Sequence, residues 1–167
     1  MKKVFIKAIA LVILAALSLS LASCGMKEYS RLGISFKIPS GYEEKAISGA
    51  KMAFGDDESF IVFNKYTAGE LSAIGLGLGV REYTERFLEQ TKIGVDDPTY
   101  NASETRAEFS YVVKDPDNDS TYYYYYVLIL KGDNCIWAVQ MACYADLIYK
   151  YEDKFVDWAE DIDPTAE

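Results

Sequence analysis

The chain has 167 residues, half of them hydrophobic, and it carries a formal net charge of −9 at neutral pH. This length is typical of a single domain, and the acidic balance is the opposite of the basic surface that binds nucleic acid. The sequence contains no histidine, which excludes catalysis by Ser-His-Asp or Cys-His groups and zinc or iron sites with histidine ligands.

The first segment has the pattern of a secretory signal peptide. Lys2, Lys3 and Lys7 precede an apolar run over residues 8–17, after which small residues become frequent. The run is shorter than the roughly 20 apolar residues that a membrane-spanning helix needs. A positive start, a short apolar middle and small residues at the end predict a signal peptide over residues 1–23.

The end of this segment resembles the bacterial lipobox, in which an aliphatic residue and two small residues precede a cysteine. Here the motif is Leu21-Ala22-Ser23-Cys24. The resemblance implies cleavage before Cys24 and attachment of lipid, with palmitate among its acyl chains, to that cysteine. The protein would then be anchored to the extracytoplasmic face of a bacterial cell membrane. The alternative is an ordinary signal peptide followed by a chance cysteine.

Removal of residues 1–23 makes the chain more acidic. That segment holds three lysines and no acidic residue, so 14 Lys and Arg remain against 26 Asp and Glu, a net charge of about −12. A domain of this charge is repelled by anionic lipid, so a covalent anchor is the expected means of membrane attachment. We expect residues 24–30 to be a tether and residues 31–167 to form one globular domain.

The first half of the domain is predicted to contain three strands and a helix. Alternating apolar residues predict strands over residues 34–38, 51–54 and 60–66. The glycine-rich residues 67–79 lack the spacing of a nucleotide-binding loop and are expected to form a flexible connector. Residues 80–93 have apolar residues at helical spacing, and Glu82 and Arg86 are placed to pair on the exposed face of that helix.

The second half is predicted to contain three longer strands and a closing helix. The strands cover residues 104–114, 121–132 and 135–144, and the helix starts near Asp146. The middle strand includes five consecutive tyrosines and is apolar on both faces, so it should be covered on both sides. Structural core is the favoured interpretation of these tyrosines. The alternative is a ligand groove at the tyrosine-rich end, with Tyr122, Tyr123 and Tyr124 as candidate residues.

Together these elements predict an α+β fold. The expected architecture is an antiparallel sheet of about six strands with helices on both faces, a three-layer α/β/α sandwich. Cys135 and Cys143 lie on one expected strand, which separates them by roughly 26 Å and leaves them too far apart for a disulfide. We therefore expect two buried free thiols.

Two short motifs resemble those of a known family. Residues 33–43, GISFKIPSGYE, resemble the opening strand of Mog1/PsbP-like proteins, and Phe155-Val156-Asp157-Trp158 resembles part of their closing helix. The resemblance implies an antiparallel sheet flanked by helices over most of residues 29–163, and a non-catalytic accessory or binding role. The histidines that bind metal in some members have no counterpart in this sequence.

One acidic stretch has part of the pattern of a calcium loop. Asp115, Asp117 and Asp119 alternate as acids do at the start of an EF-hand, but Ser120 replaces the required glycine and Tyr126 replaces the bidentate glutamate. A hairpin turn is the favoured interpretation, and weak calcium binding is left open.

The sequence therefore favours an extracytoplasmic, lipid-anchored binding or accessory protein of the bacterial cell envelope, without enzymatic activity, metal or cofactor. We expect a monomer whose partner is another envelope protein or a small ligand. The alternative is a hydrolase of wall or extracellular glycans that works with two carboxylates about 5 to 9 Å apart.

Overall fold

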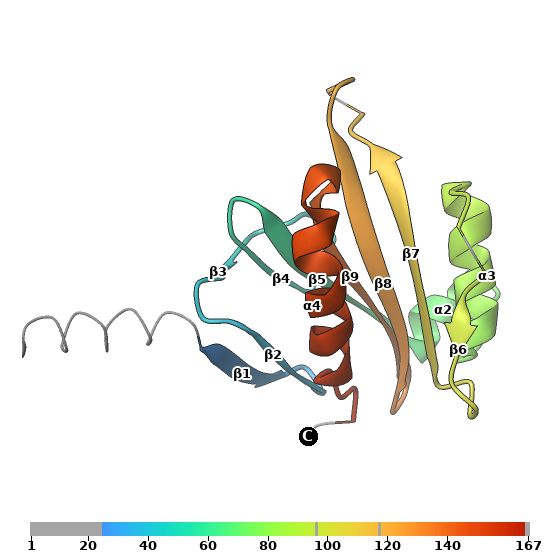
Figure 1. Cartoon of the computed structure of the whole chain (residues 1–167). Coiled ribbons are helices and arrows are strands. Elements are labelled where there is room, and N and C mark those ends of the chain that lie inside the picture. Colours follow the sequence, from blue (N-terminus) through green and yellow to red (C-terminus); the bar gives the residue numbers. More distant parts are fainter. Residues whose placement is uncertain (1–24, 96, 117, 166–167) are drawn as a thin grey trace, which may run out of the picture.

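The computed structural model describes residues 25–95, 97–116 and 118–165. Its main feature is a seven-stranded antiparallel sheet, accompanied by a separate two-stranded sheet (Figure 1). In chain order the elements are β1 (Met26–Arg31), β2 (Ile34–Pro39), β3 (Glu43–Glu44), β4 (Met52–Gly55), β5 (Ser59–Thr67), α2 (Ala68–Ala73), α3 (Val80–Thr91), β6 (Thr99–Tyr100), β7 (Arg106–Lys114), β8 (Tyr122–Gly132), β9 (Cys135–Tyr144), the 3-10 turn η2 (Ala145–Leu147) and α4 (Ile148–Glu160). In the part of the chain that the structure describes, no helix is both long and apolar enough to cross a membrane.

The longest strands form the centre of the main sheet, whose order is β3-β4-β5-β9-β8-β7-β6. β8 and β9 pair from Tyr123 opposite Tyr144 to Gly132 opposite Cys135. Because successive side chains of a strand point to opposite faces, the apolar residues of this hairpin are shared between both faces. Each face consequently has its own hydrophobic core.

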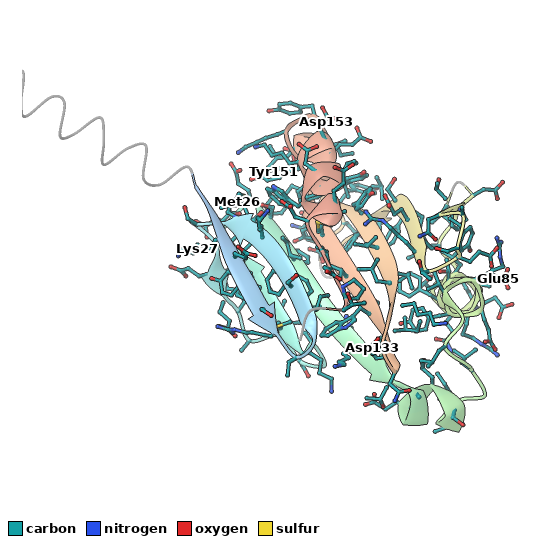
Figure 2. All side chains as sticks on the ribbon, turned by 90° about the horizontal axis from the view of Figure 1, so that it is seen from below. Met26, Lys27, Glu85, Asp133, Tyr151 and Asp153 are labelled. Atoms are coloured by element: carbon teal, nitrogen blue, oxygen red, sulfur yellow. The ribbon has the colours of Figure 1, made fainter. Side chains whose placement is uncertain are left out.

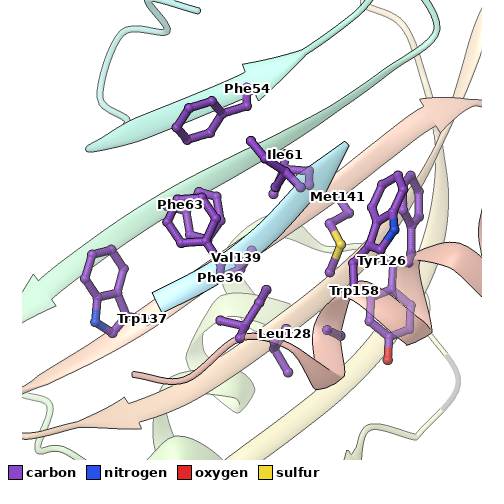
Figure 3. Close-up of a cluster of buried hydrophobic side chains, with 14 of the residues drawn as sticks. Phe36, Phe54, Ile61, Phe63, Tyr126, Leu128, Trp137, Val139, Met141 and Trp158 are labelled. Atoms are coloured by element: carbon purple, nitrogen blue, oxygen red, sulfur yellow. The ribbon is translucent and has the colours of Figure 1, made fainter. Parts of the chain in front are cut away.

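The core on one face lies beneath α4 and the β1–β2 hairpin. Figure 3 shows Phe36 of β2, Phe63 of β5 and Val139 of β9 gathered in this core, with Trp158 of α4 at its edge. The rings of Phe36 and Phe63 are 4.2 Å apart between centroids. The layer that covers this face is therefore part helix and part strand.

The core on the other face lies beneath α2 and α3. Leu71 of α2 and Val80 of α3 are fully buried there with Ile129 of β8. Figure 2 shows that α4, marked by Asp153, lies on the opposite side of the sheet from α3, marked by Glu85. The mid-chain helices α2 and α3 thus cover one face of the sheet, and the two ends of the described chain, the β1–β2 hairpin and α4, cover the other.

The α+β class and the antiparallel sheet expected from the sequence are confirmed, but the expected layering is only partly correct. The main sheet has seven strands, and among the described residues the strands clearly outweigh the three α-helices. β2, expected within the main sheet, pairs with β1 instead. The reason is that its inward side chains, Ile34, Phe36 and Ile38, pack across the face of the main sheet rather than extending its edge.

Residues 26–30, expected to be part of a tether, belong to β1. The strand pairs with β2 along its whole length, and Tyr29 stacks on Phe36 with ring centroids 5.4 Å apart. The amide of Ser40 donates to the carbonyl of Gly25 at 2.8 Å. Most side chains of β1 are polar and exposed, so periodicity alone did not predict the strand.

The segment expected to be a loose connector contains the short helix α2. It begins with a capping box, in which the Thr67 hydroxyl accepts from the Glu70 amide and the Glu70 carboxylate accepts from the Thr67 amide. The glycine-rich residues that follow are held by Glu82, whose carboxylate accepts from the Gly77 amide at 3.1 Å. Glu82 therefore does not pair with Arg86, whose ion pair is with Glu89.

Candidate functional site

The tyrosine-rich strand divides its side chains between the two faces of the sheet. Tyr124 is buried against Phe155 of α4, with parallel rings 6.3 Å apart. Tyr123 lies on the other face and stacks on Tyr144 of β9, with ring centroids 5.3 Å apart. Tyr122, at the strand end, lines a hollow of about 370 Å³. The three candidate residues therefore do not line one groove, and only Tyr122 reaches the hollow.

The hollow at the ends of β8 and β9 combines aromatic rings with polar groups. Its lining is made of Ser120, Thr121, Tyr122, Tyr144, Ala145, Asp146 and Leu147. Tyr122 is 47% exposed and Tyr144 is 38% exposed, so both rings are accessible. An exposed aromatic side chain beside a carboxylate and two hydroxyls suits a small ligand that has an apolar face and several hydroxyl groups, because a ring can cover the face and the polar groups fix its orientation.

A run of aromatic rings extends from the hollow across the face of the sheet that α3 partly covers. Tyr123 is edge-on to Tyr125 at 6.4 Å, and Tyr125 stacks on Tyr111 of β7 at 5.1 Å. Phe60 of β5 meets Tyr125 edge-on at 6.1 Å. Because Tyr123 also stacks on Tyr144, these contacts link Tyr144 to four further rings of the sheet. The wall of the hollow is therefore pre-organised, which lowers the entropy cost of binding. Sequence periodicity could not reveal the contribution of Tyr144, since it comes from a different strand.

The acidic turn before the hollow has the contacts of a hairpin turn. The Asn118 side chain accepts hydrogen bonds from the amide and the hydroxyl of Ser120, at 3.2 and 2.8 Å. Asp119 forms an ion pair with Lys114, and Asp117 lies outside the described residues. Among the residues that the structure describes, no group of three or more Cys, Asp or Glu side chains is placed to hold a metal ion.

Asp115 belongs to the same turn. Its amide donates to the carbonyl of Thr121 at 2.9 Å, which closes the turn between β7 and β8. Burial, and secondarily the nearby Asp115 carboxylate, raise the pKa of Tyr125. The position of Asp115 thus supports the turn rather than the calcium interpretation.

A second hollow, of about 290 Å³, lies at the opposite end of β5 and β9 and is lined in part by Lys65, Asp133 and Cys135. The Lys65 ammonium is 5.2 Å from the centroid of the buried Trp137 ring, whose N–H has no hydrogen-bond partner among the described residues. Burial raises the pKa of the Cys135 thiol, so the thiol is a weak nucleophile at neutral pH. Cys135 and Cys143 are both buried and free, as expected.

A third hollow, of about 210 Å³, gathers several carboxylates. It is lined by Glu43, Asp56 and Asp57 together with Gly41, Lys45 and Gly55. The Asp56 carboxylate accepts from the amide of Ser59 at 2.8 Å, so it is engaged in the turn between β4 and β5. By comparison, the described lining of the tyrosine-lined hollow contains a single carboxylate, that of Asp146.

Comparison with known proteins identifies the fold. No protein-family model matches the sequence, and no curated protein matches it. PsbP (CyanoP) from the cyanobacterium Synechocystis matches the structure with a TM-score of 0.55 at 10% identity, over 84% of this chain and 96% of that chain. The Ran-binding protein Mog1p of Saccharomyces cerevisiae matches with a TM-score of 0.53 at 8% identity, over 86% and 97%. A crystal structure from Bacteroides thetaiotaomicron matches with a TM-score of 0.50 at 11% identity, over 84% of this chain and 48% of that chain.

The chain therefore has a Mog1/PsbP-like fold, as the motifs in residues 33–43 and 155–158 implied. At these identities the likeness concerns the fold alone. The function is accordingly argued from the residues of this chain.

Proposed function

We propose that this protein is a lipid-anchored, non-catalytic binding protein of the bacterial cell envelope, held on the extracytoplasmic face of the membrane through Cys24. In this proposal the binding site is the hollow between Tyr122 and Tyr144, and the ligand is a polyhydroxylated molecule such as a sugar unit of an envelope glycan. The observation that carries the site is the hollow itself, whose lining includes two exposed tyrosines, one carboxylate and two hydroxyl-bearing residues.

The arrangement of the fold is compatible with this attachment. Gly25 alone separates Cys24 from β1 in the sequence. A lipid on Cys24 would thus hold the β1–β2 hairpin close to the membrane. In Figure 1 the tip of the β7–β8 hairpin, next to the hollow, points away from the start of β1. The hollow would therefore be accessible to a ligand while the protein is anchored.

Cys24→Ser is expected to abolish lipid attachment, because the thiol is the acceptor of the lipid. Cells that express the full chain would be grown with labelled palmitate, and the label on the purified protein would be measured. The label should fall to background in Cys24→Ser and remain in Ser23→Ala, which keeps a small residue before the cysteine. Equal labelling of the Cys24→Ser chain would contradict the proposed anchor.

Tyr144→Ala is expected to weaken glycan binding about tenfold, because a stacked aromatic contact contributes about 0.5–1.5 kcal/mol beyond its buried area. Oligosaccharides released from bacterial cell walls would be titrated calorimetrically into the detergent-extracted full chain. Tyr149→Ala is the matched control, since Tyr149 is 84% exposed on α4 and is not part of the hollow lining.

Two results would overturn the proposed site: no binding by the unmodified chain, or an equal loss of affinity in Tyr149→Ala. Product analysis of the same mixtures tests the hydrolase alternative. Cleavage of the glycan that is lost in Glu43→Gln would assign catalysis to the carboxylate-lined hollow and would replace the present proposal.

A further inference from the structure

The main sheet has an incompletely covered edge at β7. β6 pairs with β7 only at two positions, Thr99 opposite Glu108 and Tyr100 opposite Ala107. The rest of β7, as far as Lys114, has β8 as its only neighbouring strand in the described part of the chain. Figure 1 shows the upper part of β7 extending beyond β6.

Two hydrogen bonds establish which backbone groups of β7 point outward. On the outer side, the carbonyl of Arg106 accepts from the amide of Asn101 at 3.1 Å, and on the inner side the carbonyl of Thr105 accepts from the amide of Lys131, at the end of β8, at 2.9 Å. The backbone groups of alternate residues in a strand point to opposite sides. The even-numbered residues of β7 therefore direct their N–H and C=O groups away from β8.

The outward residues beyond β6 are Ser110, Val112 and Lys114. Within the described residues their outward backbone groups have no hydrogen-bond partner. Val112 is 51% exposed, and the Lys114 ammonium is paired with Asp119. An edge of this kind is a template for pairing with another strand.

The outer edges of β1 and β3 carry the features that prevent such pairing. The outer edge of β1 carries Lys27, Glu28 and Arg31, and β3 is a two-residue strand made of Glu43 and Glu44. Charged side chains and very short strands are the usual protection of an edge. In β7 the uncharged residues 110–113 carry no such protection.

We propose that two copies of this chain associate through this edge, with their β7 strands antiparallel and Val112 opposite Val112 of the second copy. In this register Ser110 faces Lys114 of the second copy, and each outward pair exchanges both of its hydrogen bonds. Tyr111 faces Val113 of the second copy, an aromatic and β-branched pair that stabilises antiparallel sheets. No like charges face each other, so the edge is complementary to itself.

The symmetry of this pairing places the same face of the main sheet on the same side in both copies. The two-fold axis runs perpendicular to the sheet between the two Val112 residues, so α4 and the β1–β2 hairpin of both copies lie on the same side of one continuous sheet. Both Cys24 residues would then face the same membrane. This step rests on the proposed function, in which Cys24 carries the lipid anchor. Lys114 pairs with Tyr122 in β8, so the two tyrosine-lined hollows would flank the axis. This assembly departs from the monomer expected from the sequence.

The test is the mass of the full chain in mild detergent, measured by analytical ultracentrifugation across a concentration series. We expect a dimer that Val112→Lys and Val112→Pro convert to a monomer, because one places like charges face to face and the other removes an edge N–H. Val156→Lys is the matched control, since Val156 is an exposed valine on α4, and it should remain dimeric. Added salt should tighten the dimer, because both copies are acidic.

Amide hydrogen exchange provides a second measurement that does not depend on a variant. The amides of Ser110, Val112 and Lys114 should exchange at least about tenfold more slowly at concentrations at which the dimer forms, whereas those of Tyr111 and Val113, which face β8, should not change. A chain that is monomeric at every concentration, or a dimer that survives both Val112 variants, would overturn the inference. The Cys24→Ser chain should form the same dimer, so a failure of the proposed anchor is distinguishable from a failure of this proposal.

Discussion

Raising the pH above about 10, the ordinary tyrosine pKa, is expected to unfold the domain in one cooperative step. Burial is the largest cause of a raised pKa for Tyr42, Tyr83, Tyr100, Tyr111, Tyr123, Tyr124, Tyr125, Tyr126 and Tyr151. Each raised pKa means that the folded state holds its proton more tightly than the unfolded state. The contribution of these protonated hydroxyls to the free energy of unfolding is fully present below the tyrosine pKa of the unfolded chain. It is lost as the pH rises toward the higher pKa of the folded state.

The measurement follows tyrosinate absorbance and far-ultraviolet circular dichroism over the same pH series. Apart from exposed tyrosines such as Tyr149, most of the absorbance change should coincide with the loss of secondary structure. Tyr111→Phe should move the midpoint to higher pH, because it removes a buried hydroxyl whose pKa is raised by burial and by Tyr125. A gradual rise in absorbance with the dichroism unchanged would show that these hydroxyls ionise in the folded protein, against this expectation.

Replacing Phe155 by alanine is expected to destabilise the domain by about 3–5 kcal/mol, a large share of the roughly 5–15 kcal/mol that holds a domain folded. Phe155 is fully buried, and its ring lies 5.5 Å from the rings of both Tyr151 and Trp158. It also stacks on Tyr124 of β8. Truncation therefore leaves a cavity between α4 and the sheet.

Urea unfolding of the full chain in mild detergent would measure this loss. Val156→Ala, at the next position of α4 and partly exposed, is the matched control and should change the free energy of unfolding by less than about 1 kcal/mol. Similar losses in the two variants would mean that Phe155 does not anchor α4. Because Tyr124 is two residues from Tyr122, we also expect weaker glycan binding in Phe155→Ala at urea concentrations well below its midpoint.

Several parts of this structure are local and could be predicted from the sequence. A continuous run of apolar and aromatic residues predicted the strand that contains the five tyrosines, since a strand buried on both faces must be apolar at consecutive positions, and the apolar residues of the next segment predicted β9. Helical spacing predicted α3 and α4. The separation of Cys135 and Cys143 along one strand predicted two free thiols. The sequence also contains the signal for α2, a Thr67-x-x-Glu70 capping box, but the glycines that follow favour a loop.

The candidate site was only partly predictable. Alternation already required Tyr123 to face away from Tyr122 and Tyr124, yet Tyr144 and Asp146 join the hollow because β9 pairs with β8 in one particular register. That register is determined by the turn between the two strands and by the two cores, which are long-range properties. The sequence of one strand alone does not reveal its register with a neighbouring strand.

The sequence by itself determined the class of the fold, the lengths of the central strands, the amphipathic helices and the lipobox motif that ends at Cys24. Only the tertiary structure decided that β2 leaves the main sheet to pair with β1, that Tyr144 completes the hollow, and that β7 keeps an open edge. The physical reason is that periodicity records which side chains of an element are buried, whereas strand neighbours depend on contacts between residues that are far apart in the chain.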